Sequence, residues 1–180
     1  MSDTTATTEI HAMVGRFEGP LTLYATRILG DVELARDVVQ ETFLKWCHQP
    51  DEAKTRIEPH LAQWLYTVCR NSSLNIRRKE SRMYPLSDAK LQWSVSPEPH
   101  PDSALEQQED ISLVLQALDG LPDNQQEVIR LKFQHGMSYR QISSVAGLTT
   151  SYVGYLIHAG LKNIREKLAI DQTNQKKTGS

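Results

Sequence analysis

The residues that most often carry chemistry do not converge in this sequence. Asp37 and Glu41 are four residues apart, a spacing that places two carboxylates on one helix face, as in some acid/base sites. Cys47 and Cys69 lack the CxxC spacing of zinc modules. The six histidines are scattered: His11, His48, His60, His100, His135 and His158. No nucleophile elbow or phosphate loop is present. We therefore expect no catalysis, no metal and no cofactor, and interpret the two carboxylates as a solvated or partner-binding patch.

A polar stripe near the C-terminus favours nucleic-acid binding. Polar side chains recur there every three or four positions, opposite an apolar face; they are Ser151, Tyr155, His158, Lys162 and Arg165. A short helix is predicted just before, over residues 139–146, because Ser138 and Gln141 have capping-box spacing. Gly147 then allows a tight turn. A short helix, a turn and a longer helix make a helix-turn-helix, which binds DNA through its second helix. An ordinary helical hairpin with a solvated face is the alternative.

A second cluster of cations and amides lies between residues 70 and 82. It contains Arg70, Asn71, Asn75, Arg77, Arg78, Lys79 and Arg82. Amides can hydrogen-bond exposed base edges while cations neutralise phosphates. The alternative is a solvated helix end whose cations favour the C-terminal dipole.

Three helices should position this cluster, because apolar residues repeat at helical intervals and strand-like alternation is almost absent. The first covers residues 10–29, with Pro20 as a kink or break. The second, capped by Asp31, should bury Ala35, Val38, Val39, Thr42, Phe43 and Trp46. The third starts after Pro59 and should bury Leu61, Trp64, Leu65, Val68, Ser72 and Ile76. Trp46 and Trp64 are expected in the core, and Tyr66 at the surface.

A second helical domain is predicted from about Asp102 onward. Its first helix ends at Gly120 and should bury one face, formed by Ile111, Val114, Leu115 and Leu118. Pro122 fits the first position of the next helix, which should end between Gln134 and Gly136. The inner face of the last helix is Val153, Leu156 or Ile157, Gly160, Leu161, Ile164 and Leu168.

Charge separates the two helical parts. Residues 1–83 hold 11 acidic and 11 basic side chains, residues 84–110 hold six acidic against one basic, and residues 111–180 hold five acidic and eight basic. The acidic stretch contains four prolines, which favour an extended linker. No apolar run approaches the roughly 18 residues of a membrane span, and no secretory leader is visible. We expect an all-α protein of two small domains, located in the cytoplasm without membrane insertion.

Several motifs, and the order in which they occur, resemble those of one protein family. They are DVELARDVVQETFL at 31–44, WLYTVCRNSSLNIRRK at 64–79, LP at 121–122, SYRQIS at 138–143 and the final LKNIREKL. The sequence resembles a bacterial extracytoplasmic-function (ECF) sigma factor, a small two-domain initiation subunit of RNA polymerase. The resemblance implies region 2, a helical bundle, at 9–83, a linker at 84–108, region 4, a helix-turn-helix domain, at 109–170 and a tail at 171–180.

The resemblance also implies partners and site residues. Core RNA polymerase, through the clamp helices of its largest subunit, would contact Asp37, Gln40, Glu41, Phe43 and Lys45. Single-stranded non-template DNA of the −10 promoter element would contact His60, the loop before Pro59, Arg70, Asn71, Asn75, Arg77, Arg78 and Lys79. The −35 element would contact Ser138, Arg140, Thr150, Ser151, Tyr152, Tyr155, His158, Lys162 and Arg165, with region 4 near the polymerase flap. Control by an anti-sigma protein or another signal is expected.

One departure from the family concerns the recognition helix. Gly154 and Leu156 stand where family members often carry Lys and Arg. A glycine inside a helix costs about 1 kcal/mol relative to alanine, so Gly154 is expected to allow close approach of the backbone to DNA.

Three other hypotheses stay open at this point. A stand-alone helix-turn-helix regulator is the runner-up, but it leaves the 31–44 motif and the acidic linker unexplained. A nucleic-acid enzyme lacks any catalytic constellation. An anti-sigma-like adaptor would bind parts of the polymerase but not promoter DNA.

Overall fold

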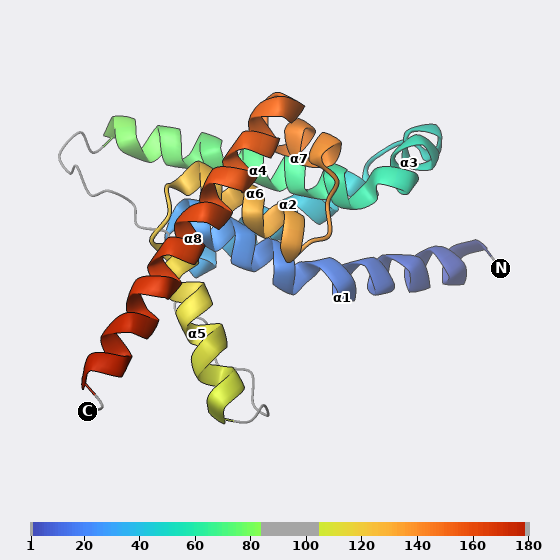
Figure 1. The fold of residues 1–180 in the computed structure, drawn as a ribbon. Coiled ribbons are helices and arrows are strands. Elements are labelled where there is room, and N and C mark those ends of the chain that lie inside the picture. Colours follow the sequence, from blue (N-terminus) through green and yellow to red (C-terminus); the bar gives the residue numbers. More distant parts are fainter. Residues whose placement is uncertain (1, 84–104, 179–180) are drawn as a thin grey trace. The chain divides into compact units, whose positions relative to one another are not determined.

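The computed structural model describes the backbone of residues 2–83 and 105–178 and the side chains of 8–82 and 111–170. Every element in these ranges is a helix, and no strand occurs within them (Figure 1). The chain divides into two compact units, residues 1–95 and 96–180. The predicted all-α fold with two helical domains is confirmed. Most of the predicted linker lies outside the described residues.

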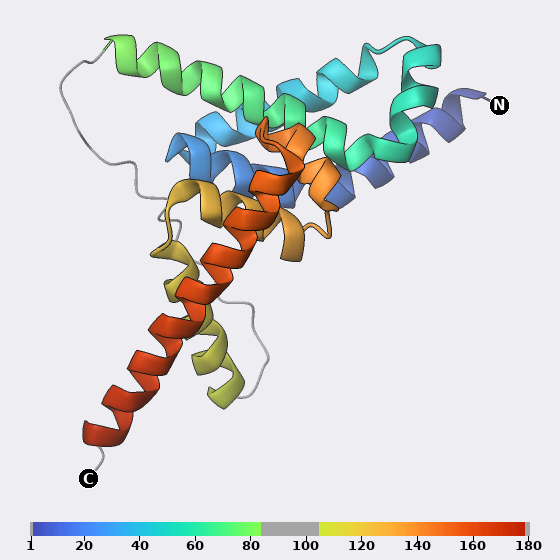
Figure 2. The same ribbon diagram turned by 45° about the horizontal axis from the view of Figure 1, so that its top comes forward.

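Three long helices pack together in the first unit: α1 (Ser2–Leu29), α2 (Val32–Cys47) and α4 (Leu61–Met83). Each of them contacts the other two, and Figure 2 shows them in blue, cyan and green. Their shared core includes Leu21, Tyr24, Leu65 and Tyr66, none more than 2% exposed. The rings of Tyr24 and Tyr66 meet edge to face, with 5.1 Å between centroids. This core fixes the outer faces of α2 and α4, where the predicted site residues lie.

α1 continues through Pro20, so of the predicted kink or break, the break is wrong. Proline removes one helical hydrogen bond and costs about 3 kcal/mol inside a helix. Pro20 lies on the exposed side of α1, where water can solvate the carbonyl left without a partner. Phe17 and Leu21, on the neighbouring face of the helix, are buried. Their burial holds the helix together across the proline.

The start and the buried face of α2 match the prediction. Oδ1 of Asp31 accepts hydrogen bonds from the backbone amides of Glu33 and Leu34, at 2.8 and 3.0 Å. The buried residues are Ala35, Val38, Val39, Thr42, Phe43 and Trp46, as the sequence predicts. Trp46 meets the half-buried Trp64 of α4 edge to face, with 5.7 Å between ring centroids.

A short helix, α3 (Asp51–Ile57), and a 3-10 turn, η1 (Glu58–His60), occupy the segment predicted to be a loop before Pro59. Acidic side chains lie in the first turn of α3 and basic ones in its last turn, which favours the helix dipole. No residue of α3 is buried. The segment therefore has no apolar stripe that would indicate a helix in the sequence.

The buried face of α4 is rotated relative to the prediction. The buried residues are Leu65, Tyr66, Cys69 and Ser73, whereas Trp64 and Val68 are only half-buried. Tyr66 is 1% exposed, so its predicted surface position is wrong. Ser73 is small, so it can lie close to the neighbouring helices. Its hydroxyl donates a hydrogen bond to the carbonyl of Cys69 at 2.9 Å and therefore needs no water partner.

The second unit contains α5 (Leu105–Asp119), α6 (Asp123–Phe133), α7 (Tyr139–Ala146) and α8 (Thr150–Thr178). α8 contacts the other three helices. α5 begins inside the range predicted as linker, and α8 continues into the predicted tail. Pro122 is the N-cap of α6 rather than its first residue. α7 begins and ends where the capping-box pattern predicts.

The predicted apolar face of α5 is buried only near its C-terminal end. Ala117 and Leu118 are each 5% exposed, whereas Ile111 is 55% and Val114 43% exposed. Apolar periodicity identifies this helix correctly. It does not determine how far along the helix its neighbour α8 covers the apolar face.

Buried polar side chains join α6 to the end of α5. Nη2 of Arg130, a residue 4% exposed, pairs with Oδ1 of Asp119 at 2.5 Å. Nε2 of Gln126 donates to the carbonyls of Asp119 and Leu121, both at 2.9 Å. Burial lowers the pKa of Arg130, and the neighbouring Asp119 opposes this by favouring the charged guanidinium. None of these contacts is predicted from the sequence.

Two glycines of α8 offer a matched stability test. A Cβ at Gly154 would lie 3.6 Å from Cε2 of Tyr139, an ordinary contact, whereas a Cβ at Gly160 would lie 2.5 Å from Cδ1 of the buried Ile129. We expect Gly154→Ala to stabilise the second unit by up to about 1 kcal/mol. Gly160→Ala should destabilise it, because overpacking costs about 1–3 kcal/mol. Urea unfolding followed by circular dichroism measures both, and equal stabilities would contradict the packing argument.

Candidate functional site

A groove of about 380 Å³ lies between α1 and α2. Its lining residues are Val14, Glu18 and Thr22 from α1 and Arg36, Asp37, Val39, Gln40, Phe43, Leu44 and Cys47 from α2. Val39 and Phe43 are buried, whereas Leu44 is 51% exposed and adds an accessible apolar side chain. Glu18 and Asp37 are exposed and acidic. An apolar centre with a charged rim is typical of a protein-docking surface.

The structure separates the five residues predicted to contact polymerase into two sets. Asp37, Gln40 and Phe43 line the groove. Glu41 and Lys45 are not among its lining residues. Phe43 is only 9% exposed, so it also belongs to the core of the first unit.

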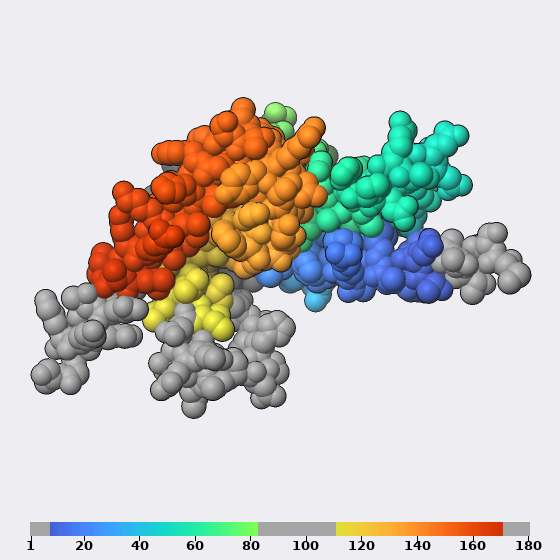
Figure 3. All heavy atoms as spheres, turned by 45° about the vertical axis from the view of Figure 1, so that its right-hand side comes forward, coloured from blue at the N-terminus to red at the C-terminus, as the bar shows by residue number. Residues whose placement is uncertain are grey.

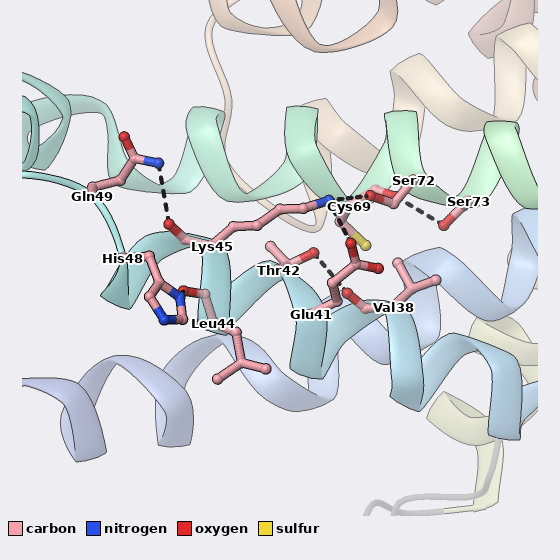
Figure 4. Close-up of polar contacts among 10 residues, drawn as sticks. All are labelled: Val38, Glu41, Thr42, Leu44, Lys45, His48, Gln49, Cys69, Ser72 and Ser73. Carbon is pink, nitrogen blue, oxygen red and sulfur yellow. Dashed lines mark hydrogen bonds and ion pairs between the residues drawn. The ribbon is translucent and has the colours of Figure 1, made fainter.

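Lys45 connects α2 to α4, as Figure 4 shows. Its Nζ lies 2.8 Å from Oε1 of Glu41 and donates to Oγ of Ser72 at 3.1 Å. The side chains of Lys45 and Glu41 are 43% and 55% exposed, so the ion pair contributes at most about 1 kcal/mol. The geometry therefore gives Lys45 a local role between the two helices, distinct from the groove.

The outer face of α4 displays the predicted amide and cation cluster. Asn71, Asn75, Arg78 and Arg82 recur at intervals of four, three and four residues and are all exposed. This spacing puts them on one face of the helix. The remaining predicted residues surround this stripe: Lys79 is exposed, and Arg70 and Arg77 are half-buried.

His60 is the predicted −10 residue outside this helix. It is exposed in η1, immediately before α4 begins. His60 is thus the last residue of a 3-10 turn, whereas the sequence predicts that the third helix begins directly after Pro59.

The second unit contains a helix-turn-helix made of α7 and α8, whose outer surfaces are orange and red in Figure 3. Oγ of Ser138 accepts from the amide of Gln141 at 3.3 Å, and Oε1 of Gln141 accepts from the amide of Ser138 at 2.9 Å. Gly147 ends α7 with a φ of 70°, a left-handed conformation that favours glycine. Oγ1 of Thr149 accepts from the amide of Tyr152 at 3.2 Å and caps α8.

All nine residues predicted to bind the −35 element are exposed: Ser138, Arg140, Thr150, Ser151, Tyr152, Tyr155, His158, Lys162 and Arg165. The side chains of two of them also have a polar partner within the protein. The Ser138 hydroxyl caps α7, and Nζ of Lys162 lies 3.9 Å from Oε1 of Glu166. The contact of each residue with DNA stays a prediction.

The packing around Gly154 does not explain why this residue is glycine. It lies one turn into α8 beside the ring of Tyr139. A Cβ there would make only an ordinary contact with this ring, so the fold itself does not require glycine.

Chemistry at the cysteines is limited. Cys69 is fully buried, and burial raises the pKa of its thiol to about 12, so the reactive thiolate is disfavoured. Cys47 is half-buried in the wall of the groove. Among the described residues, no three metal-ligating side chains gather into a site. None of the helices in these ranges is long and apolar enough to span a bilayer.

Comparisons with known proteins identify both units. The family model for Sigma-70 region 2 matches residues 13–83, and that for Sigma-70, region 4 matches residues 111–164. The ECF RNA polymerase sigma factor SigL of Mycobacterium tuberculosis is 30% identical over 142 residues, which cover 79% of this chain and 78% of SigL. SigW of Bacillus subtilis, also an ECF RNA polymerase sigma factor, is 27% identical over 151 residues, 79% of each chain.

A solved structure has the same fold. It is the sigma factor RpoE of Bartonella quintana, in complex with the anti-sigma factor NepR. The TM-score is 0.63 at 22% identity, over 91% of this chain and 98% of that one. The two family models and the SigL relative agree on the family, and the solved structure agrees on the fold. The chain belongs to the ECF family of RNA polymerase sigma factors.

Proposed function

We propose that this sigma factor divides its task in transcription initiation among three surfaces. The α1–α2 groove binds the clamp helices of core RNA polymerase. The outer face of α4, with His60, binds the unpaired non-template strand of the −10 element. The α7–α8 helix-turn-helix binds the −35 element. Polymerase supplies the bond-forming chemistry, and the protein acts in the cytoplasm beside the promoter DNA.

The groove is the observation that carries this proposal. It brings Asp37, Gln40 and Phe43 together with the exposed Leu44, so that one surface offers both charge and apolar area. Interfaces of this kind gain affinity from the apolar centre and specificity from the charged rim. In a DNA-binding regulator that acts without polymerase, the same surface would have to serve as a dimer interface or a ligand pocket.

The test is co-elution of the full chain with bacterial core RNA polymerase in gel filtration, combined with alkylation of Cys47. Because Cys47 lines the groove, a bound clamp should slow its reaction with a maleimide, followed by mass spectrometry of the peptide that contains it. Cys69 serves as the internal control, since it is buried in both states. Free elution would remove polymerase binding from the function. Co-elution without protection of Cys47 would place the contact elsewhere.

The α4 surface makes a separate prediction. Asn71→Ala should reduce the open complex about five-fold or more, because an amide that holds an unpaired base contributes about 1–3 kcal/mol. The closed complex should change little. Permanganate reactivity of unpaired thymines measures the first quantity, and a gel shift at low temperature measures the second.

Asn124→Ala is the matched control for Asn71→Ala. Asn124 is an exposed asparagine on α6, in the other unit. If both variants open promoters as well as the parent protein, Asn71 does not hold a base.

Control by an inhibitory protein is part of the same proposal. An anti-sigma partner blocks initiation if it covers the groove or the helix-turn-helix. Protection of Cys47 by such a protein, without polymerase, would assign it to the groove. Loss of promoter binding with Cys47 still reactive would assign it to the second unit.

A further inference from the structure

Two tyrosines form an exposed aromatic pair at the start of α8. Tyr152 is 43% and Tyr155 63% exposed, yet their rings stack on each other, with 5.9 Å between centroids and 11° between planes. Stacking restricts the rotation of both rings. The pair therefore presents a rigid, mostly apolar surface to solvent.

The backbone before the pair places it in the part of the helix that reads bases. Thr149 caps α8, so Tyr152 lies in the first turn and Tyr155 in the second. In a helix-turn-helix, N-terminal residues of the second helix contact base edges in the major groove. Tyr139 of α7, 40% exposed, lies beside Gly154 of α8.

The surroundings fit duplex DNA. Nζ of Lys132 lies 5.4 Å from the ring centroid of Tyr139. Arg140, Lys162 and Arg165 are exposed on the same two helices. Cations around an apolar centre match a major groove bordered by phosphates. The apolar group that a major groove offers at base edges is the 5-methyl group of thymine.

We propose that Tyr155, held by its stack on Tyr152, contacts thymine 5-methyl groups and makes thymine a specificity determinant of the −35 element. This inference rests on the proposed role of α7–α8 in binding that element. Beyond that role, it identifies the base that is recognised (thymine), the contacted group (the 5-methyl) and the side chain that makes the contact (Tyr155). The phenol hydroxyl is not required, because the contact is apolar.

The experiment begins with holoenzyme, assembled from core polymerase and the full chain, which selects promoters from a randomised duplex library. Each thymine of the selected −35 element is then replaced by uracil, which removes only the 5-methyl group. We expect uracil at one or two positions to weaken binding roughly four-fold, as for one buried methyl-sized group. Uracil elsewhere in the element should have little effect.

Protein variants assign the contact to the aromatic pair. Tyr155→Ala should weaken binding to the thymine duplex and abolish the difference between thymine and uracil. Tyr155→Phe should keep that difference, since it retains the ring. Ile170→Ala is the control, because it removes an equally exposed apolar side chain (60%) from the same helix, about 22 Å further along its axis.

The results separate two kinds of failure. If holoenzyme forms and selects a −35 element, but uracil is tolerated everywhere or Tyr155→Ala keeps the uracil penalty, the thymine contact is wrong and the proposed function stands. If Tyr155→Phe behaves like Tyr155→Ala, the hydroxyl and not the ring makes the contact, which also overturns the inference. If no −35 element is selected, the proposed role of α7–α8 fails, and the inference fails with it.

Discussion

Asp37→Arg is expected to weaken the binding of core RNA polymerase by at least about 30-fold. Asp37 lies on the exposed rim of the α1–α2 groove, which the accessible apolar side chain of Leu44 also lines. Reversing a charge at the edge of a docked surface replaces an attraction with a repulsion, and the loss is about 2 kcal/mol or more. The effect should decrease at high salt, because exposed charges are screened.

Glu41→Arg is the matched comparison for Asp37→Arg. It makes the same change of charge one turn further along α2, at a residue that pairs with Lys45 and does not line the groove. We expect it to weaken binding much less. Affinity measured by fluorescence anisotropy of labelled protein, at two salt concentrations, compares the variants, and circular dichroism checks that both remain folded. Equal losses would mean that polymerase covers the whole outer face of α2.

Local signals account for what the sequence predicts well. The buried residues of α2, the cap at Asp31 and the capping box of α7 each depend on residues within one helix or one turn. Side-chain periodicity and cap chemistry contain that information directly. The helix-turn-helix could be predicted for the same reason, since the left-handed turn that ends α7 favours a glycine, and Gly147 follows the capping box at the matching distance.

The features that the sequence does not predict either depend on contacts with other helices or leave no apolar pattern. α4 buries Tyr66 and Ser73 because two helices cover it from different sides, and no periodicity within α4 specifies both partners. α3 buries nothing and so lacks a pattern. The pairing of Arg130 with Asp119 joins two helices across a turn.

In the candidate site, too, some features follow from local sequence and others only from tertiary packing. Which residues of α2 are exposed follows from its stripe, so Asp37, Gln40 and Glu41 could all be placed on its outer surface. Only the packing of α1 against α2 separates the groove residues from Glu41. The motif resemblance implies that these residues contact polymerase, and only the tertiary structure shows which of them line the groove together.

Asp119→Ala is expected to destabilise the second unit by about 3–5 kcal/mol. Arg130 is 4% exposed and pairs with the Asp119 carboxylate. Removing the carboxylate leaves a buried guanidinium without its counter-charge, which costs more than losing a surface ion pair. Burial already lowers the pKa of Arg130, but arginine remains protonated throughout the physiological range, so it cannot escape the cost by losing its proton.

The reciprocal variant separates this cost from the net contribution of the pair. Arg130→Met removes the buried charge and keeps much of the side-chain volume, while Asp119 is 31% exposed and can be solvated by water. We expect a loss of at most about 1 kcal/mol, because apolar replacement of a buried ion pair is often neutral. Urea unfolding by far-UV circular dichroism measures both variants. Fluorescence of Trp46 and Trp64, in a Trp93→Phe background, reports the first unit and should not change. If Asp119→Ala is no worse than Arg130→Met, the buried charge is solvated or paired with another group, and the expected difference between the two variants is wrong.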